Sequence, residues 1–237
     1  ATGAAAYRVK LYPGTWTVSF DNLQCLDDAV PCQALGLRTV ALAGDGVLDL
    51  DLPVVHLAGQ VTVNGEQMPP SPQGLLRGRV VFEESLAGAV ACGLGASGPA
   101  RYELDLFPGT YRVAFENTQD CTEGAVPCLT RTLREGLAVS GDGALDLDLA
   151  VVTIAGRVRV DGEPMPDSIT GAERGRLRFV LESGGFVEAS LGHEGPAGYS
   201  LELVPGIYSI LFEGDDCPPE VDGAVPCQGA LLEGCSP

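Results

Sequence analysis

The chain has 237 residues, of which 45% are hydrophobic, and a mean hydropathy of +0.17, so we expect packed globular structure rather than disorder. Its formal net charge is −18, from 14 Lys and Arg against 32 Asp and Glu, and this charge disfavours nucleic acid and anionic membranes as partners. Cations and basic surfaces are compatible partners, although solubility is the simpler reason for such a charge.

Cysteine usage indicates the compartment. There are eight cysteines, six of them in repeated short-range pairs, which indicates an oxidising environment and predicts an extracellular or cell-surface location. No signal peptide and no apolar run of transmembrane length is visible in the printed sequence. The 32 Gly and 17 Pro residues favour short strands separated by turns over long helices.

The first element along the chain is repeated. The phrase YRVKLYPGTWTVSF at 7–20 returns as YELDLFPGTYRVAF at 102–115 and as YSLELVPGIYSILF at 199–212. A second phrase, GDGVLDLDLPVVHLAGQVTVNGE at 44–66, returns as GDGALDLDLAVVTIAGRVRVDGE at 141–163. The first phrase recurs after 95 and then 97 residues, which is the length of one small domain rather than of a solenoid turn.

Within the one complete copy, alternating apolar and polar residues predict seven short strands. They are expected near 57–63, 75–83, 87–93, 101–107, 110–116, 132–140 and 144–151. Pro108-Gly109 is expected to form a type II turn that joins the fourth and fifth of these as an antiparallel hairpin, and Asn64-Gly65 predicts another tight turn. No segment has a sustained helical period, so the predicted fold class is all-β, in tandem seven-stranded antiparallel β-sandwich modules.

The repeat divides the chain into three parts. Residues 1–54 hold only the second half of a module, 55–151 a complete β-sandwich module, and 152–237 a module that lacks its last strand. The modules meet at LPVVHLAG and LAVVTIAG without a flexible spacer, which predicts a stiff, rod-like array. Two explanations of the incomplete ends stay open: the chain is an excerpt of a longer array, or a neighbouring chain completes the ends by strand addition.

Three phrases of the last copy carry a family resemblance: GRVRVDGEPMPD at 156–167, GRLRFVLESGG at 175–185 and GYSLELVPGIYSILFEG at 198–214. Together they resemble the carboxypeptidase regulatory-like, or transthyretin-like, β-sandwich modules of exported bacterial proteins. The resemblance implies an Ig-like or transthyretin-like sandwich and an exported or surface-attached protein. Collagen-adhesin B-type stalk modules are similar but often carry an internal Lys crosslink, which the second and third copies exclude because they contain no lysine.

The paired cysteines are predicted to form local disulfides, each closing the loop after one copy of the first phrase. The pairs are Cys25 with Cys32, Cys121 with Cys128, and Cys217 with Cys227. A zinc site would need four ligands and redox catalysis would favour Cys-x-x-Cys, so no metal or redox role is expected. A ring of about eight residues stabilises by roughly 2 to 3 kcal/mol in the chain-entropy model. Cys92 and Cys235 have no counterparts in the other copies; they could pair between modules, bridge neighbouring chains or remain buried free thiols.

Acidic residues around the cysteine loops raise the question of calcium. They are Asp27, Asp28, Glu123, Asp215, Asp216, Glu220 and Asp222. Calcium requires six to eight oxygens in a defined order, and no Asp-x-Asp-x-Asp-Gly run occurs, so a solvated acidic surface is the favoured interpretation. The LDLDL segments alternate Asp with Leu, which is expected to place their carboxylates on the solvent face of a strand.

Residues that could support catalysis or sugar binding are few. The two histidines, His56 and His193, lie far from the cysteines in sequence, and His56 is expected to be a packing or surface residue. Trp16 occupies the position of Tyr111 and Tyr208, so it is predicted to be a core residue rather than a sugar-stacking platform. No Gly-x-Ser-x-Gly, His-Glu-x-x-His or phosphate-loop motif occurs, and neither an enzyme nor a cofactor is expected.

The sequence therefore predicts a non-enzymatic extracellular structural or adhesive repeat protein. Its partners could include further copies of itself, joined head to tail into a fibre by strand addition at the incomplete modules, or a component of the cell surface. The alternative is a ligand-binding accessory region of a larger exported protein, in which the acidic loops bind calcium or a basic partner.

Overall fold

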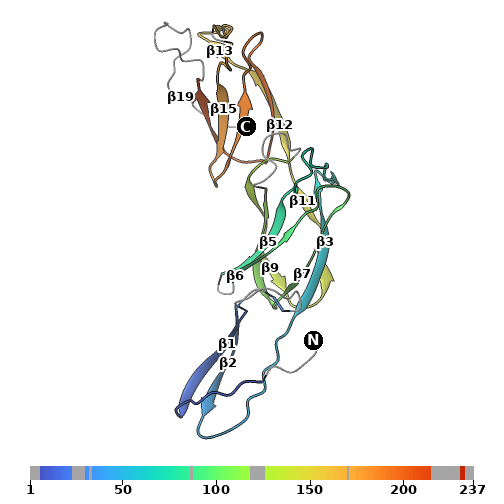
Figure 1. Cartoon of the computed structure of the whole chain (residues 1–237), viewed down its shortest axis with the longest axis vertical. Helices are drawn as coiled ribbons and strands as arrows, with labels where there is room; N and C mark the ends of the chain where they lie inside the picture. The colour runs from blue at the N-terminus through green and yellow to red at the C-terminus, as the bar shows by residue number, and fades with distance from the viewer. Residues whose placement is uncertain are drawn as a thin grey trace.

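The computed structural model describes residues 6–22, 30–31, 34–85, 88–117, 126–169, 171–214 and 230–232. These residues form strands and no helix, and three β-rich parts follow one another along the long axis of the molecule (Figure 1). The predicted all-β class and the sandwich architecture are confirmed. The alternating patterns and closely spaced turn residues account for it, because they allow only short strands.

Two sheets make up the second module. The first sheet is built on β3 (Val55–Val63), which pairs with β4 (Glu66–Gln67), β7 (Ala100–Leu106), β10 (Gly143–Ala144) and β11 (Leu147–Leu149). The second sheet has the order β6-β5-β8-β9, with β5 (Arg79–Glu84), β6 (Gly88–Gly93), β8 (Gly109–Glu116) and β9 (Thr130–Val139). The seven predicted strands correspond to β3, β5, β6, β7, β8, β9 and the pair β10 and β11, but β4 was not predicted, so the count of seven is not confirmed.

The core of this module lies between the two sheets. Its largest fully buried side chains include Phe82, Leu106, Tyr111, Phe115 and Leu149. Along β7 the burial alternates residue by residue, and the buried side chains are those that period two assigns to one face. The apolar face predicted for this strand is therefore confirmed.

The predicted hairpin at Pro108-Gly109 is wrong. β7 pairs with β3 in one sheet, whereas β8 pairs with β5 and β9 in the other, so the connection is a corner between sheets. Gly109 begins β8 and is not among the glycines with positive φ, so no type II turn forms. The Tyr111 hydroxyl closes the corner by donating to the Phe107 carbonyl oxygen at 2.6 Å. The apolar faces of β7 and β8 pack against each other across the core, an arrangement that has the same sequence period as a hairpin.

One strand pairing also differs from the predicted antiparallel order. β10 and β11 run parallel to β3, with Gly143 opposite Leu57 and Leu147 opposite Val61. The chain reaches them from β9, which belongs to the opposite sheet. A strand that arrives by such a crossover can be parallel to its new neighbour, because no tight turn connects the two.

The third module repeats much of this plan. β12 (Val152–Arg157) pairs with β17 (Gly198–Leu203), and the second sheet has the order β16-β15-β18-β19, with β15 (Arg176–Leu181), β16 (Phe186–Ser190), β18 (Tyr208–Glu213) and β19 (Ala230–Leu232). β13 (Arg159–Val160) and β14 (Glu163–Pro164) form a short hairpin. Leu177, Phe179 and Phe212 lie in the core of the third module. Among the described residues β12 has no neighbour on its other side.

The first part of the chain contributes one hairpin, β1 (Gly14–Asp21) with β2 (Ala34–Leu42), irregular between Val18 and Ser19. The indole N–H of Trp16 donates to the Tyr12 carbonyl oxygen at 3.0 Å. The Tyr111 hydroxyl likewise donates to the carbonyl oxygen of the residue four positions before it. The predicted equivalence of position is therefore confirmed. The prediction that Trp16 is a core residue is wrong: Trp16 is 37% exposed, because no second sheet covers it among the described residues.

Candidate functional site at the module junctions

Carboxylates of the GDGALDLDL segment accept hydrogen bonds from backbone amides of β3 and of the turn that follows it. The amides of His56, Gln60 and Gly65 donate to the Oδ1 atoms of Asp142 (2.8 Å), Asp146 (3.0 Å) and Asp148 (2.7 Å), respectively. Asp146 and Asp148 are exposed beside the buried Leu147 and Leu149, so the expectation that the LDLDL carboxylates lie on the solvent face is confirmed, and these carboxylates also accept backbone hydrogen bonds. A free strand edge presents unpaired N–H groups, and here side-chain oxygens accept from them where the short ladder does not.

Tyr102 and Gly59 set the distance between β3 and residues 141–149, the closing segment, which pairs in parallel with it. The Tyr102 hydroxyl, reaching from β7 across β3, donates to the Leu145 carbonyl oxygen at 2.5 Å. Gly59 lies under this contact, and a Cβ added to it would be 1.9 Å from the same oxygen. Burial, with a smaller contribution from Asp146, raises the pKa of Tyr102, so its hydroxyl keeps the proton that it donates. Only glycine at position 59 allows this approach.

Asn64 fixes the last residue of the second module, directly before the third begins. Its Nδ2 donates to the Val151 carbonyl oxygen at 2.8 Å, and its Oδ1 accepts from the Val151 N–H at 2.9 Å. Asn64 adopts a φ of 52° in the predicted turn before Gly65, a conformation that Asn tolerates well. Val151 is buried, and β12 begins at the next residue, so this pair of bonds fixes the point at which one module becomes the next.

The hydrophobic core continues through the same junction. Leu181 and Val204 of the third module are buried in one cluster with side chains of the second, and Val204 is fully covered. At the other end of the second module, the rings of Phe20 and Phe107 meet edge to face with centroids 6.0 Å apart. Core packing across a junction resists bending because bending would expose apolar surface.

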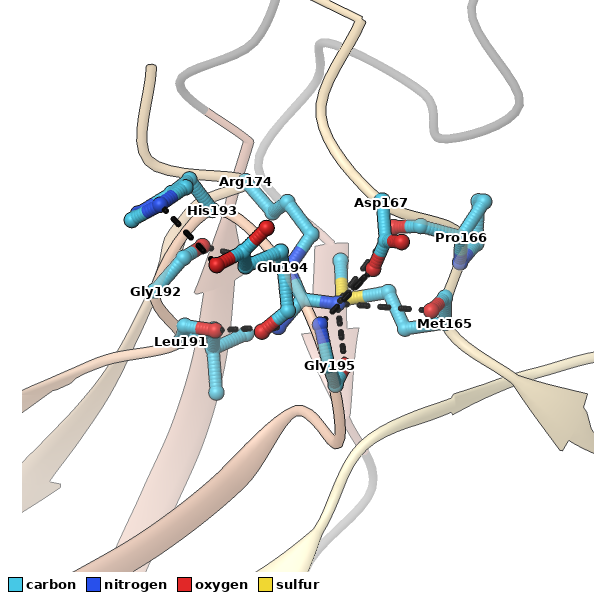
Figure 2. A network of polar contacts seen from close by, with 9 residues as sticks. All are labelled: Met165, Pro166, Asp167, Arg174, Leu191, Gly192, His193, Glu194 and Gly195. Atoms are coloured by element: carbon cyan, nitrogen blue, oxygen red, sulfur yellow. Dashed lines mark hydrogen bonds and ion pairs between the residues drawn. The ribbon is translucent and has the colours of Figure 1, made fainter. Parts of the chain in front are cut away.

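A buried arginine organises the outer loops of the third module (Figure 2). Arg174 is only 2% exposed, and its guanidinium donates to six backbone carbonyl oxygens. They are those of Met165 (3.3 Å), Pro166 (3.4 Å), Leu191 (2.6 Å), Gly192 (3.1 Å), Glu194 (3.3 Å) and Gly195 (2.9 Å). The Asp167 carboxylate lies 3.9 Å from Nη1 and accepts from the Gly195 amide. Carbonyl dipoles thus replace the water that the charge loses on burial.

The second module contains the same network around Arg77. This side chain is also 2% exposed, and it donates to carbonyl oxygens of two loops. The acceptors are Met68 (2.8 Å), Pro69 (3.3 Å), Gly95 (2.5 Å), Ser97 (3.4 Å) and Gly98 (3.0 Å). Desolvation lowers the pKa of Arg77 from its ordinary value. Neither arginine was among the predicted site residues, although RGR recurs at 77–79 and 174–176, each time after a Met-Pro pair, and this repeat could have identified them.

The structure describes two of the eight cysteines. Cys128 is disulfide-bonded, and because Cys92 is free, the partner of Cys128 lies outside the described residues. The three local pairings stay predictions, since Cys25, Cys32, Cys121, Cys217 and Cys227 all fall outside that part of the chain. Cys235 falls outside it too. Cys92 is a free, half-buried thiol in β6. Because it is free, it forms no disulfide to another module, and a disulfide to a neighbouring chain stays a prediction.

The remaining candidates have structural or surface roles where they are described. His56 contacts Asp105 at 2.9 Å and Glu103 at 3.0 Å on the surface, and His193 lies 3.8 Å from Glu194. The hydrogen bond to Asp105 raises the pKa of His56, assisted by the nearby carboxylates. The acidic loop residues considered for calcium are Asp27, Asp28, Glu123, Asp215, Asp216, Glu220 and Asp222, and all lie outside the described residues.

The described residues hold neither a metal-binding cluster nor a membrane-spanning helix. They contain no cluster of three or more His, Cys, Asp or Glu side chains placed to bind a metal ion. They also contain no helix, and so none long and apolar enough to span a membrane.

Known proteins offer weak likenesses. No protein-family model matches the chain, and no curated protein matches it in sequence. A DUF3823 family protein from Parabacteroides merdae is similar in structure with 11% identity, 69% of this chain and 92% of that chain covered, and a TM-score of 0.28. A candidate carbohydrate-binding protein from Bacteroides uniformis has 13% identity, 75% and 99% coverage, and a TM-score of 0.27. The Bacillus anthracis TIE protein has 13% identity, 76% coverage of this chain but 31% of that chain, and a TM-score of 0.25. TM-scores this low transfer no function.

Proposed function

We propose that this chain is a non-enzymatic structural element outside the cell, in which β-sandwich modules form a stiff spacer. The observation that carries this proposal is the shared core at the junction, where Leu181 and Val204 are buried with side chains of the second module. The two Asn64 bonds to Val151 support it, because they fix both backbone groups of the residue before β12. The cysteine content supports the extracellular location.

The finer proposal is assembly of such spacers into a fibre. A head-to-tail contact joins two different surfaces of successive copies. It produces a ring only if the rotation between copies closes, and otherwise it produces an open filament. Within the part of the third module that the structure describes, one edge of β12 has no partner strand, and this supports the proposal. The alternative role in binding calcium or a basic partner depends on loop residues outside the described part, and it stays a prediction.

Stiffness can be measured directly by NMR relaxation. If the junction is rigid, backbone amides of β5 and β15 should report one common rotational correlation time, because the two modules tumble together. Insertion of Gly-Gly-Ser between Val151 and Val152 is the matched control, since it should separate the two values. Distinct and shorter correlation times in the unmodified chain would contradict the proposal.

A further inference from the structure

We propose that β12 of the third module binds residues 44–54 of a second copy of this chain as an added parallel strand. The inference rests on the proposed structural role and specifies the surfaces through which copies would join. Residues 44–54 and β12 lie toward opposite ends of the molecule (Figure 1), so a contact between them joins two copies. Each copy then offers one strand and one edge, and the contact extends into a filament.

The second module contains the template for this contact. There, β3 pairs in parallel with the segment GDGALDLDLAV at 141–151. Residues 44–54 read GDGVLDLDLPV, which differs from that segment at two positions. One difference places Pro53 at the counterpart of Ala150, which lies just beyond the end of β11, so the missing N–H does not interrupt the ladder. The same strand should therefore fit an edge like that of β3.

β12 repeats the geometry of β3. It pairs with β17 in the register that β3 has with β7, so Val152 faces Leu203 as Val55 faces Leu106. The amide of Thr153 therefore corresponds to that of His56, which donates to Asp142 in the second module. Among the described residues β12 pairs only with β17, so the N–H groups on its other side correspond to those that β3 turns toward residues 141–149.

The apolar side chains of β12 lack the cover that β3 has. Val55 is 4% exposed but its counterpart Val152 is 43% exposed, and Leu57 is 6% exposed against 41% for Ile154. In the second module Leu147 and Leu149 are buried, and they pair with Val61 and Val63 further along β3. Leu50 and Leu52 hold the same positions in residues 44–54, so in the added strand they would lie opposite the half-buried Val158 and Val160. Addition of that strand would bury apolar surface that is otherwise in contact with water.

A tyrosine is already in place for the incoming backbone. Tyr199 is the counterpart of Tyr102, and its hydroxyl lies over Gly156, where an added Cβ would be 2.6 Å away. Tyr102 donates to Leu145 across the corresponding glycine. In residues 44–54 the counterpart of Leu145 is Leu48, whose carbonyl oxygen accepts from Tyr7 of its own chain at 2.5 Å. Strand exchange would replace the Tyr7 bond with an equivalent Tyr199 bond, so this contact does not oppose it.

Charge at the edge selects an acidic strand. β3 has Gln60 and Thr62 beside the carboxylates of its closing segment, and the third module has Arg157 and Arg159 at these positions. Both arginines are exposed, in a chain with more than twice as many acidic as basic residues. Asp49 and Asp51 of the added strand would lie next to them. This complementarity offsets part of the repulsion between two copies that each carry a net charge of −18.

The test is binding of a fluorescein-labelled peptide of residues 43–54 to the full chain, followed by fluorescence anisotropy in about 0.15 M salt. We expect saturable binding, and we expect sedimentation velocity to show oligomers of the full chain that excess unlabelled peptide dissociates. Thr153→Pro removes the outward N–H on an edge strand and should weaken binding by about tenfold or more. The control Thr153→Ala keeps that N–H and should bind as the unmodified chain does.

A second pair of variants covers the case that Thr153→Pro disturbs folding. Arg157→Glu should weaken peptide binding by about tenfold, whereas the control Arg134→Glu, which reverses an exposed charge on β9, should leave it unchanged. The proposal is overturned if the peptide fails to bind and the chain stays monomeric, or if Arg157→Glu binds as well as the control. Either result leaves the stiffness measurement unaffected, so failure of this interface is distinguishable from failure of the spacer role.

Discussion

Replacement of Arg77 by Met should selectively destabilise the second module. The side chain is 2% exposed and holds together two loops, one containing Met68 and Pro69 and the other Gly95 to Gly98. Methionine fills a similar volume but donates no hydrogen bond. Five backbone carbonyls therefore lose the guanidinium that they accept from, and the loops lose the group that connects them.

The magnitude follows from the burial and from the number of bonds. Each buried acceptor left without a donor costs about 1 to 3 kcal/mol, but carbonyls near a loop surface regain water once the guanidinium is gone. Removal of one component of a buried charged network typically costs about 3 to 5 kcal/mol. The free energy of unfolding of the second module should therefore fall by about 3 kcal/mol or more. This corresponds to a more than hundredfold faster exchange of its core amides.

Hydrogen exchange followed by mass spectrometry can measure this, because it reports on peptides of each module separately. Peptides from β5 and β8 should lose protection in Arg77→Met, and the core peptides of the third module, where Arg174 is intact, should lose less. Arg79→Met is the control, since Arg79 is exposed and its ion pair with Glu116 at 2.7 Å contributes at most about 1 kcal/mol. If Arg77→Met exchanges no faster than Arg79→Met, the network does not stabilise the module.

The pKa of His56, measured by NMR titration, should lie above its ordinary value of 6.5, and it should fall in Asp105→Asn. Protonated His56 therefore stabilises the fold fully at pH values below 6.5. This stabilisation is lost as the pH rises through the raised pKa. Gly59→Ala should lower the melting temperature by several degrees because its Cβ would meet a backbone oxygen at 1.9 Å, whereas Gly141→Ala, with nothing within 4 Å, should not. Non-reducing peptide mapping should find Cys128 in a disulfide within its own loop, and its removal should lower stability by about 2 to 3 kcal/mol.

The fold class could be predicted from the sequence because local pattern determines it. Period-two burial in β7 and the turn at Asn64 both depend on residues that are neighbours in sequence. The hairpin wrongly predicted at Pro108-Gly109 also rested on this local pattern. A hairpin and a corner between two sheets place the same side chains inward, so the pattern of apolar residues does not distinguish them.

The candidate site was harder to predict because its contacts join residues far apart in the chain. Asp142 and His56 are 86 positions apart, and Arg77 donates to carbonyl oxygens of residues up to 21 positions away. The repeat made the LDLDL segment visible, but an acidic residue beside leucine on a strand resembles any solvated strand. Only the pairing with β3 shows that its carboxylates accept backbone hydrogen bonds.

The sequence by itself determined the β-strand pattern, the repeat and the module length, because these depend on side-chain period and on the conformations that Gly, Pro and Asn permit. The tertiary structure alone decided which strand pairs with which, the burial of Arg77 and Arg174, and the continuity of the core between modules. These depend on the free energy of contacts between distant segments, where a buried arginine is stable only if two separate loops bring their carbonyls to it.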